Sequence, residues 1–268
     1  MKMLANTDRF FANHPVFRLE EFRDEFGDSN KDRTIRNRIQ QFLKSQRLRL
    51  LSSGIYAVVP GGVDADDFAP DPILVAARLA KDSIIAYHSA FELMGYAQQP
   101  FYQTTYLTAG HRRKLQLNSS AFISLPPPRR LGDEWSRVGV ETIRRQGLPI
   151  KVTSRERTLV DCLDRQQYSG GFEELFACVG AMPSMDFGLL ESYLEKLHSP
   201  TLYARVGFVL ERFADRLFIE DQMLERLAKC TPKSPVYLLR RSAGNVLVRR
   251  WNLLAPPETL RQDGSVLQ

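Results

Sequence analysis

Five side chains suited to reading DNA fall at helical spacing in the first sixth of the chain. They are Arg33, Arg36, Asn37, Gln40 and Lys44. Arg can donate two parallel hydrogen bonds to guanine, Asn and Gln can pair with adenine, and Lys suits phosphate. At about 100° per residue the five project from one side of a helix with no acid among them, whereas a merely solvated helix usually mixes charge signs. The spacing therefore predicts a helix face that contacts nucleic acid.

The opposite side of this helix is apolar. Ile35, Ile39, Phe42 and Leu43 share it, as expected for a helix half-buried against a core. Upstream, the stretch VFRLEEF predicts a short strand followed by a helix, which Gly27 ends. Asp28 or Ser29 can cap the next helix. The resulting turn of roughly 3 to 4 residues between two helices is the spacing of a helix-turn-helix.

Downstream, residues 47–51 and 54–59 are β-rich runs separated by a serine- and glycine-containing turn, which predicts a hairpin, or wing, carrying Arg47 and Arg49. Residues 28–62 hold seven Lys or Arg against two acids, an excess of five, while the whole chain has an excess of six. Phosphate attraction explains this concentration of charge. A basic helical domain that docks a protein is the alternative. We predict a winged helix-turn-helix DNA-binding domain at 1–62.

Composition limits the remaining possibilities. The 268 residues are 43% hydrophobic and 25% charged, as in soluble globular proteins. With no apolar run of about 20 residues and no signal-peptide segment at the start, we expect a cytoplasmic protein without a membrane role. The three cysteines and four histidines form no C-x-x-C and no local cluster. We therefore expect buried thiols, no metal and no cofactor.

The remaining sequence predicts a second domain. Residues 63–72 are rich in glycine, acids and proline, as in a linker. From 73 to 255 we expect a mixed α/β domain: helices at 72–82 and 88–94, a mainly antiparallel sheet from strands at 102–108, 121–125, 138–145 and 150–152, and a helical C-terminal part. Helices are expected at 172–182, 187–197 and 202–217, a hairpin at 236–240 and 246–251, and a loose tail at 256–268. The expected class is α+β.

One helix start has a distinctive pattern. Thr153 and Glu156 fit a capping box, in which each side chain would accept from a backbone amide at the helix start. Leu159, Val160 and Leu163 would form the buried face of this helix. Arg157 and Asp161 are four residues apart and can pair, either on the surface or across to another element.

Basic residues recur in loops beyond residue 100. They form a candidate second basic surface, for nucleic acid or a partner, although such runs are more often solvated. Its residues are Arg112, Arg113, Lys114, Arg129, Arg130, Arg240, Arg241, Arg249 and Arg250.

Catalytic signatures are missing from the sequence. It contains no G-x-G-x-x-G, P-loop, G-x-S-x-G or H-E-x-x-H motif. A metal-dependent nuclease needs acids that converge on a cation, yet the acid-rich stretches are the linker at 64–67 and the helix at 161–164. We expect no enzymatic activity, and a DNA-processing enzyme is the weakest of the alternatives.

Three stretches resemble a known family. They are GIYAVVPG, which ends the expected winged helix, YHSAFELMG, and above all LPIKVTSRERTLVDCL. Together they resemble the AbiEi-type antitoxins of bacterial toxin-antitoxin systems, over most of residues 5–255. VTSRERTLVD at 152–161 is the most specific element. The chain departs from the family pattern in its basic final hairpin and in the tail after Trp251, which leaves the antitoxin surface undetermined.

The resemblance implies two activities. The N-terminal domain would bind operator DNA and repress its own operon. The sequence shows no dimerisation helix with heptad spacing, which leaves separate monomers meeting on DNA as one way to fill inverted repeats. The larger region would counteract a nucleotidyltransferase-type toxin of the AbiEii kind without a stable complex. From the residues alone, the alternative is a transcriptional regulator whose C-terminal domain senses a ligand or protein and has no toxin partner.

Overall fold

A computed structural model describes residues 2–27, 32–111, 114–239 and 244–260. The protein has an α+β fold that divides into two compact units. The first contains Met1–Ile85, Tyr102–Leu125 and Thr142–Val152, and the second contains the intervening stretches and the C-terminal part. The expected DNA-binding residues thus share a unit with several strands from beyond residue 73. Within the described ranges, every helix is too short or too polar to cross a lipid bilayer.

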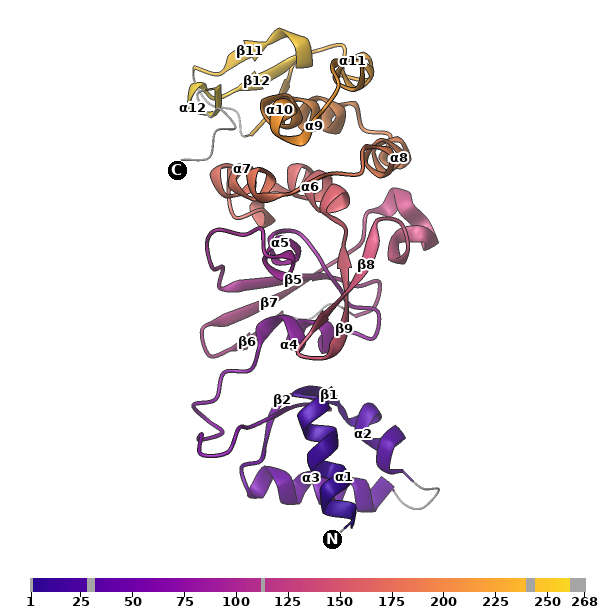
Figure 1. Ribbon diagram of the computed structural model, residues 1–268, viewed down its shortest axis with the longest axis vertical. Coiled ribbons are helices and arrows are strands. Elements are labelled where there is room, and N and C mark those ends of the chain that lie inside the picture. The colour runs from indigo at the N-terminus through magenta and orange to yellow at the C-terminus, as the bar shows by residue number, and fades with distance from the viewer. Residues whose placement is uncertain (1, 28–31, 112–113, 240–243, 261–268) are drawn as a thin grey trace. The chain divides into compact units, whose positions relative to one another are not determined.

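The first unit begins with three helices and a small sheet (Figure 1). The elements are α1 (Lys2–Asn13), β1 (Val16–Arg18), α2 (Leu19–Phe26), α3 (Asp32–Lys44), β2 (Leu48–Ser52) and β3 (Ile55–Val58). β3 is central, and both β1 and β2 pair with it antiparallel. Gly27 follows the last residue of α2, as the sequence predicts.

An aromatic cluster holds these elements together. Phe10 and Phe11 of α1 pack with Phe17 of β1 and Phe22 of α2, and all four are buried. The ring centroids of Phe10 and Phe22 are 5.3 Å apart in an edge-to-face arrangement, which aromatic pairs favour. α3 joins this core through the apolar side predicted from its spacing: Ile35, Ile39, Phe42 and Leu43.

The first unit also contains most of a six-stranded sheet. α4 (Pro72–Leu79) precedes it and starts as predicted, with Asp71 accepting from Ile73 N at 2.9 Å, but it ends at Leu79 rather than residue 82. The sheet has the order β6-β7-β5-β4-β9-β8. Its strands are β4 (Ile84–Ile85), β5 (Gln103–Leu107), β6 (Lys114–Leu117), β7 (Ser120–Leu125), β8 (Val140–Arg145) and β9 (Leu148–Thr153).

The sheet is mixed. β5 pairs parallel with β7, and β4 pairs parallel with β9, whereas β4–β5 and β6–β7 are antiparallel. The short strand β4 and the strand β6 were not predicted from sequence. β4 has two residues, too few to show an alternating pattern.

The second unit is mostly helical. Its main helices are α5 (His88–Met94), α6 (Arg155–Asp164), α7 (Phe172–Ala181), α8 (Phe187–Leu197), α9 (Pro200–Arg212), α10 (Ala214–Leu217) and α11 (Asp221–Lys229). Gly95 ends α5 in the left-handed conformation, as expected of glycine there. The helix expected at 202–217 is two helices separated at Phe213, and α11 was not predicted.

The predicted C-terminal hairpin is wrong. β10 (Val236–Tyr237) and β11 (Val246–Val248) both pair with a third strand, β12 (Leu253–Ala255), which lies between them. The tail expected to be loose from residue 256 begins with α12 (Pro257–Leu260), in which Thr259 is buried. Cys162 and Cys178 are buried as predicted, but Cys230 is exposed.

Replacing Gly207 with Ala is expected to destabilise the second unit by about 1 to 3 kcal/mol. Gly207 lies in α9, and a Cβ there would lie 2.0 Å from the ring of Trp251, whose side chain is fully buried. This overpacking outweighs the gain of about 1 kcal/mol from the better helix propensity of Ala. Chemical denaturation followed by Trp fluorescence measures the change. Lys229→Ala, an exposed change on α11, is the control and should shift stability by less than about 0.5 kcal/mol. A stabilising Gly207→Ala would contradict this packing.

Candidate functional site

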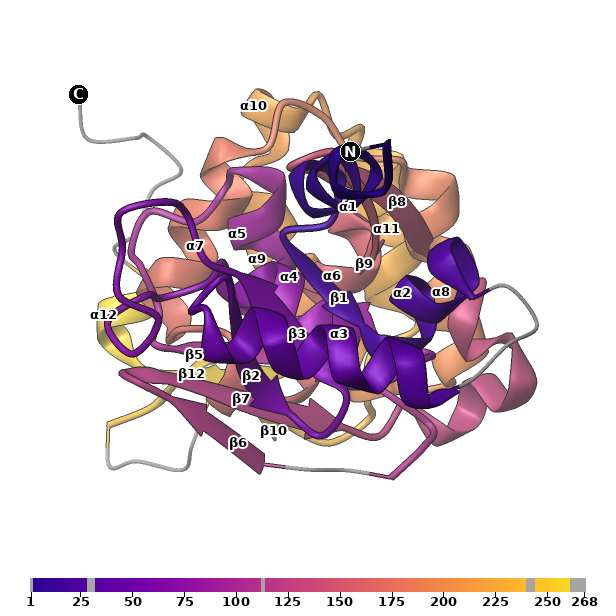
Figure 2. The same ribbon diagram turned by 90° about the horizontal axis from the view of Figure 1, so that it is seen from below.

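One face of α3 carries the predicted DNA-reading side chains, and all of them are exposed: Arg33, Arg36, Asn37, Gln40 and Lys44. In Figure 2, α3 lies in front of the three-stranded sheet, with its axis across the view. An α-helix fits the DNA major groove, which is about 12 Å wide. The structure thus keeps these five donors together on an accessible helix surface.

Two further polar residues extend this face. Thr34 and Gln41 are exposed, and with Asn37 they follow the i, i+3, i+7 spacing that places side chains in one row on a helix. Neither was among the predicted DNA-reading residues, although both share the helical spacing of Asn37. The face therefore offers an additional amide and hydroxyl for hydrogen bonding.

α3 is held in place by burial of its apolar side and by an ion pair. Ile35 and Ile39 are 4% and 1% exposed, so the rotation of the helix about its axis is set by the aromatic core. Asp32 in the first turn pairs with Arg23 of α2, with Nε and Oδ1 3.1 Å apart. That pairing also neutralises the acid nearest to the exposed donors.

Arg47 and Arg49 already have partners within the first unit. Arg47 pairs with Asp8 and lies over the rings of Phe11 and Phe42, at 5.3 and 5.2 Å from their centroids. Arg49 donates to the backbone oxygen of Phe68 and, at 3.0 Å, to Asn118 Oδ1. Both side chains therefore stabilise the first unit, and a DNA contact by either would compete with these interactions.

The predicted wing has a tight, anchored turn. Gly54 has φ +72°, which favours glycine, and its carbonyl accepts from Leu19 N at 2.8 Å. Leu50 on β2 is 53% exposed. The hairpin is thus held against the start of α2, and the turn itself carries no cation.

The candidate second basic surface is only partly described. Arg112, Arg113, Arg240 and Arg241 lie outside the described residues. Lys114, Arg129 and Arg249 are exposed. Arg130 donates to the backbone oxygens of Leu197 and His198 at the end of α8, and Arg250 pairs with Glu211 and Asp221. Arg130 and Arg250 therefore have structural partners.

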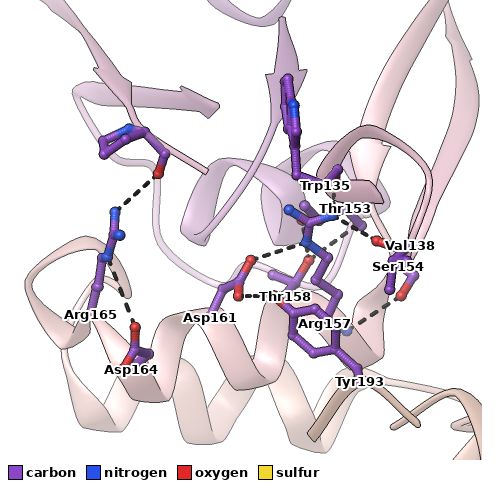
Figure 3. A network of polar contacts seen from close by, with 11 residues as sticks. Trp135, Val138, Thr153, Ser154, Arg157, Thr158, Asp161, Asp164, Arg165 and Tyr193 are labelled. Atoms are coloured by element: carbon purple, nitrogen blue, oxygen red, sulfur yellow. Dashed lines mark hydrogen bonds and ion pairs between the residues drawn. The ribbon is translucent and has the colours of Figure 1, made fainter. Parts of the chain in front are cut away.

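The TSRERT stretch forms a buried polar network in the second unit (Figure 3). Arg157 is fully buried and donates through Nη1 to the carbonyls of Trp135 and Val138, both at 2.6 Å, and through Nε to Asp161 Oδ2 at 3.3 Å. Tyr193 donates to Asp161 Oδ1 at 2.5 Å. The Arg157–Asp161 pair is therefore in the core, and it links α6 to the segment before β8 and to α8.

The predicted capping box is corrected by the structure. Ser154, not Thr153, caps α6, and its Oγ accepts from Arg157 N at 3.3 Å. Thr153 instead shares a hydrogen bond with Thr158, with the two Oγ1 atoms 2.7 Å apart. Glu156 accepts from Asp186 N at 2.8 Å, at the start of α8, rather than reaching back to the cap.

Burial dominates the electrostatics of this network. It raises the pKa of the Asp161 carboxyl, while Arg157 and the Tyr193 hydroxyl oppose the rise. Burial and the neighbouring Asp161 also raise the pKa of Tyr193 well above its ordinary value. These shifts belong to groups enclosed by protein, so the network suits a structural role rather than ligand binding.

The chain was also compared with known proteins. No family model matches it. No curated protein matches it either. A crystal structure of the RV2827C protein from Mycobacterium tuberculosis is similar, with a TM-score of 0.58 and 18% sequence identity over 95% of this chain and 92% of that one. At this identity the similarity shows a shared fold.

Proposed function

We propose that this chain is a DNA-binding transcriptional autorepressor and an antitoxin, with a winged helix-turn-helix formed by the first six elements. The element order α1–β1–α2–α3–β2–β3 and the antiparallel sheet order β1-β3-β2 support the winged-helix assignment. α3 is then the recognition helix in the major groove. The observation that carries the proposal is the exposed, acid-free donor face of α3.

Roles on α3 follow from side-chain chemistry. Arg33 and Arg36 contact guanine edges, Asn37 and Gln40 contact adenine edges, and Lys44 contacts phosphate. Because Arg47 and Arg49 are engaged within the protein, we assign them a supporting role. No catalytic step is part of this proposal.

Autorepression is tested with a reporter driven by the DNA upstream of this gene. Wild-type protein is expected to lower reporter output, and an Arg33→Ala/Arg36→Ala variant to restore most of it, because the donors that select the operator are lost. Lys229→Ala, an exposed change on α11, is the control and should repress like wild type. Full repression by the double variant would contradict the assignment of α3.

The antitoxin activity rests on the resemblance of YHSAFELMG and VTSRERTLVD to the AbiEi type. Its functional partner would be a nucleotidyltransferase-type toxin, opposed without a stable complex. A toxin of this type, encoded beside this gene, should stop growth when it is expressed alone. Co-expression of this protein should then restore growth. The Arg33→Ala/Arg36→Ala variant should rescue growth as well as wild type does, because the second unit carries this activity.

A regulator without a toxin partner is the second candidate. It is favoured by a cavity of about 530 Å³ in the second unit, lined in part by Gln166, Gln167 and Arg205. That volume lies within the range of small-molecule sites. Absence of a neighbouring toxin gene, or failure to rescue growth while repression is intact, would favour this candidate.

A further inference from the structure

Three potential metal ligands meet inside the second unit. His88 begins α5, while Glu174 and Cys178 are four residues apart on α7 and so share one face of that helix. One ligand atom from each, a nitrogen, an oxygen and a sulfur, lies within 4.8 Å of the others. His88, Glu174 and Cys178 are 1%, 4% and 0% exposed. This cluster could not be predicted from the sequence, because His88 is 86 residues from Glu174.

The carboxylate in this cluster is crowded by donors. Glu174 Oε1 lies 3.0 Å from His88 Nε2, 2.9 Å from Gln98 N, 3.3 Å from Gln99 N and 3.5 Å from Cys178 Sγ. A carboxylate oxygen offers about two lone pairs, so four donors exceed its capacity. Replacing the two side-chain protons by one cation would relieve this excess.

We propose that His88, Glu174 and Cys178 bind one divalent transition-metal ion, with Zn²⁺ as the preferred ion. Imidazole, carboxylate and thiolate are the ligand types of zinc sites, and tetrahedral Zn²⁺ with bonds of about 2.0 to 2.3 Å places its ligands roughly 3.3 to 3.7 Å apart. The nitrogen and oxygen atoms are 3.0 Å apart and the sulfur and oxygen atoms 3.5 Å apart, close to this range, and all three ligand atoms lie within 4.8 Å of one another.

The charges balance when the metal is bound. Gln98 N and Gln99 N both donate to Glu174 Oε1, an arrangement that suits the carboxylate form of this side chain. Coordination releases the thiol proton of Cys178 to solvent and moves the imidazole proton from Nε2 to Nδ1. A carboxylate, a thiolate and a neutral imidazole then compensate the two positive charges of the ion.

The surroundings fit a site with three protein ligands. A cavity of about 310 Å³, lined in part by Gly170, Gly171 and Glu174, lies beside the carboxylate, and water is the usual fourth ligand where a protein supplies three. Gly170 has φ +81°, and a Cβ there would lie 2.9 Å from both His88 Cδ2 and Glu174 Cγ, so glycine lets the backbone close over these side chains.

The outer shell of the site is incomplete. Among the residues that the structure describes, His88 Nδ1 has no hydrogen-bond partner. Loss of such an outer partner typically weakens a metal site by about 10- to 100-fold. We therefore expect weaker Zn²⁺ binding than at a site whose histidine donates to a carboxylate or carbonyl.

Titration of the full-length protein with Co²⁺, followed by competition with Zn²⁺, tests the proposal. One Co²⁺ per chain should bind, with near-ultraviolet thiolate-to-cobalt absorption that Zn²⁺ abolishes. Cys178→Ser should remove this absorption, and Glu174→Gln should weaken Co²⁺ binding by at least about 10-fold. Cys230→Ser changes an exposed cysteine and is the matched control, with an unchanged spectrum expected.

Absence of the thiolate band in the wild type, or its persistence in a folded Cys178→Ser variant, would overturn the metal assignment. If Cys178→Ser does not fold, a Cys162→Ala/Cys230→Ser variant settles the question, because Cys178 is then the remaining thiol of three. A band in this variant supports the site, and its absence in the folded variant contradicts it.

Discussion

Replacing Arg157 with Ala is expected to lower the free energy of unfolding of the second unit by about 3 to 5 kcal/mol. The substitution leaves Asp161 as a buried carboxylate without its cation and removes the donor to the carbonyls of Trp135 and Val138. Breaking one partner of a buried pair costs far more than the pair contributes relative to an apolar replacement.

Trp fluorescence during chemical denaturation is a suitable measurement, because both tryptophans of the chain, Trp135 and Trp251, belong to the second unit. Arg157→Lys should be intermediate, since it keeps the charge but loses the two-nitrogen geometry. Arg216→Ala, an exposed change on α10, is the control and should shift stability by less than about 0.5 kcal/mol. A loss below about 1 kcal/mol in Arg157→Ala would contradict the structural role of the network.

Substitutions on α3 are expected to have the second-largest effect. Arg33→Ala and Arg36→Ala should each weaken operator binding by about 1 to 3 kcal/mol, or roughly 5- to 150-fold, and relax specificity at one base pair. Lys44→Ala should weaken binding to all sequences alike and reduce the salt dependence by about one counterion. Fluorescence anisotropy with operator variants separates these two effects.

The matched control for these variants is again Lys229→Ala, which should bind operator like wild type. Arg49→Ala should change operator affinity less than Arg36→Ala does, because Arg49 already bonds to Phe68 and Asn118. Unchanged affinity after Ala substitution at Arg33, Arg36 and Gln40 would show that α3 is not the recognition helix.

Local sequence patterns correctly predicted the elements that depend on residue spacing and on helix-ending residues. The apolar spacing of Ile35 and Ile39 gave α3 and its buried side, and Gly95 gave the end of α5. The donor face of α3 followed from the same spacing, because a helix that buries one side must expose the other. These features depend on residues within a few turns of one another.

Features that depend on distant residues could not be predicted. The prediction of a hairpin at 236–251 was wrong because β12, which follows β11 in the sequence, pairs with both β10 and β11. The sequence spacing of Arg157 and Asp161 is the same whether the pair lies on the surface or in the core. In the structure, Trp135 and Tyr193 enclose the pair in the core. His88 and Glu174 likewise meet through tertiary packing.

The most direct test of DNA recognition is a binding titration of the intact protein against DNA from upstream of its own gene and against scrambled DNA of equal length, across a salt series. The proposal predicts affinity for the upstream DNA at least about 10³-fold tighter than for the scrambled DNA, with both weakening as salt rises. Equal affinity for the two DNAs, or binding to neither, would contradict it.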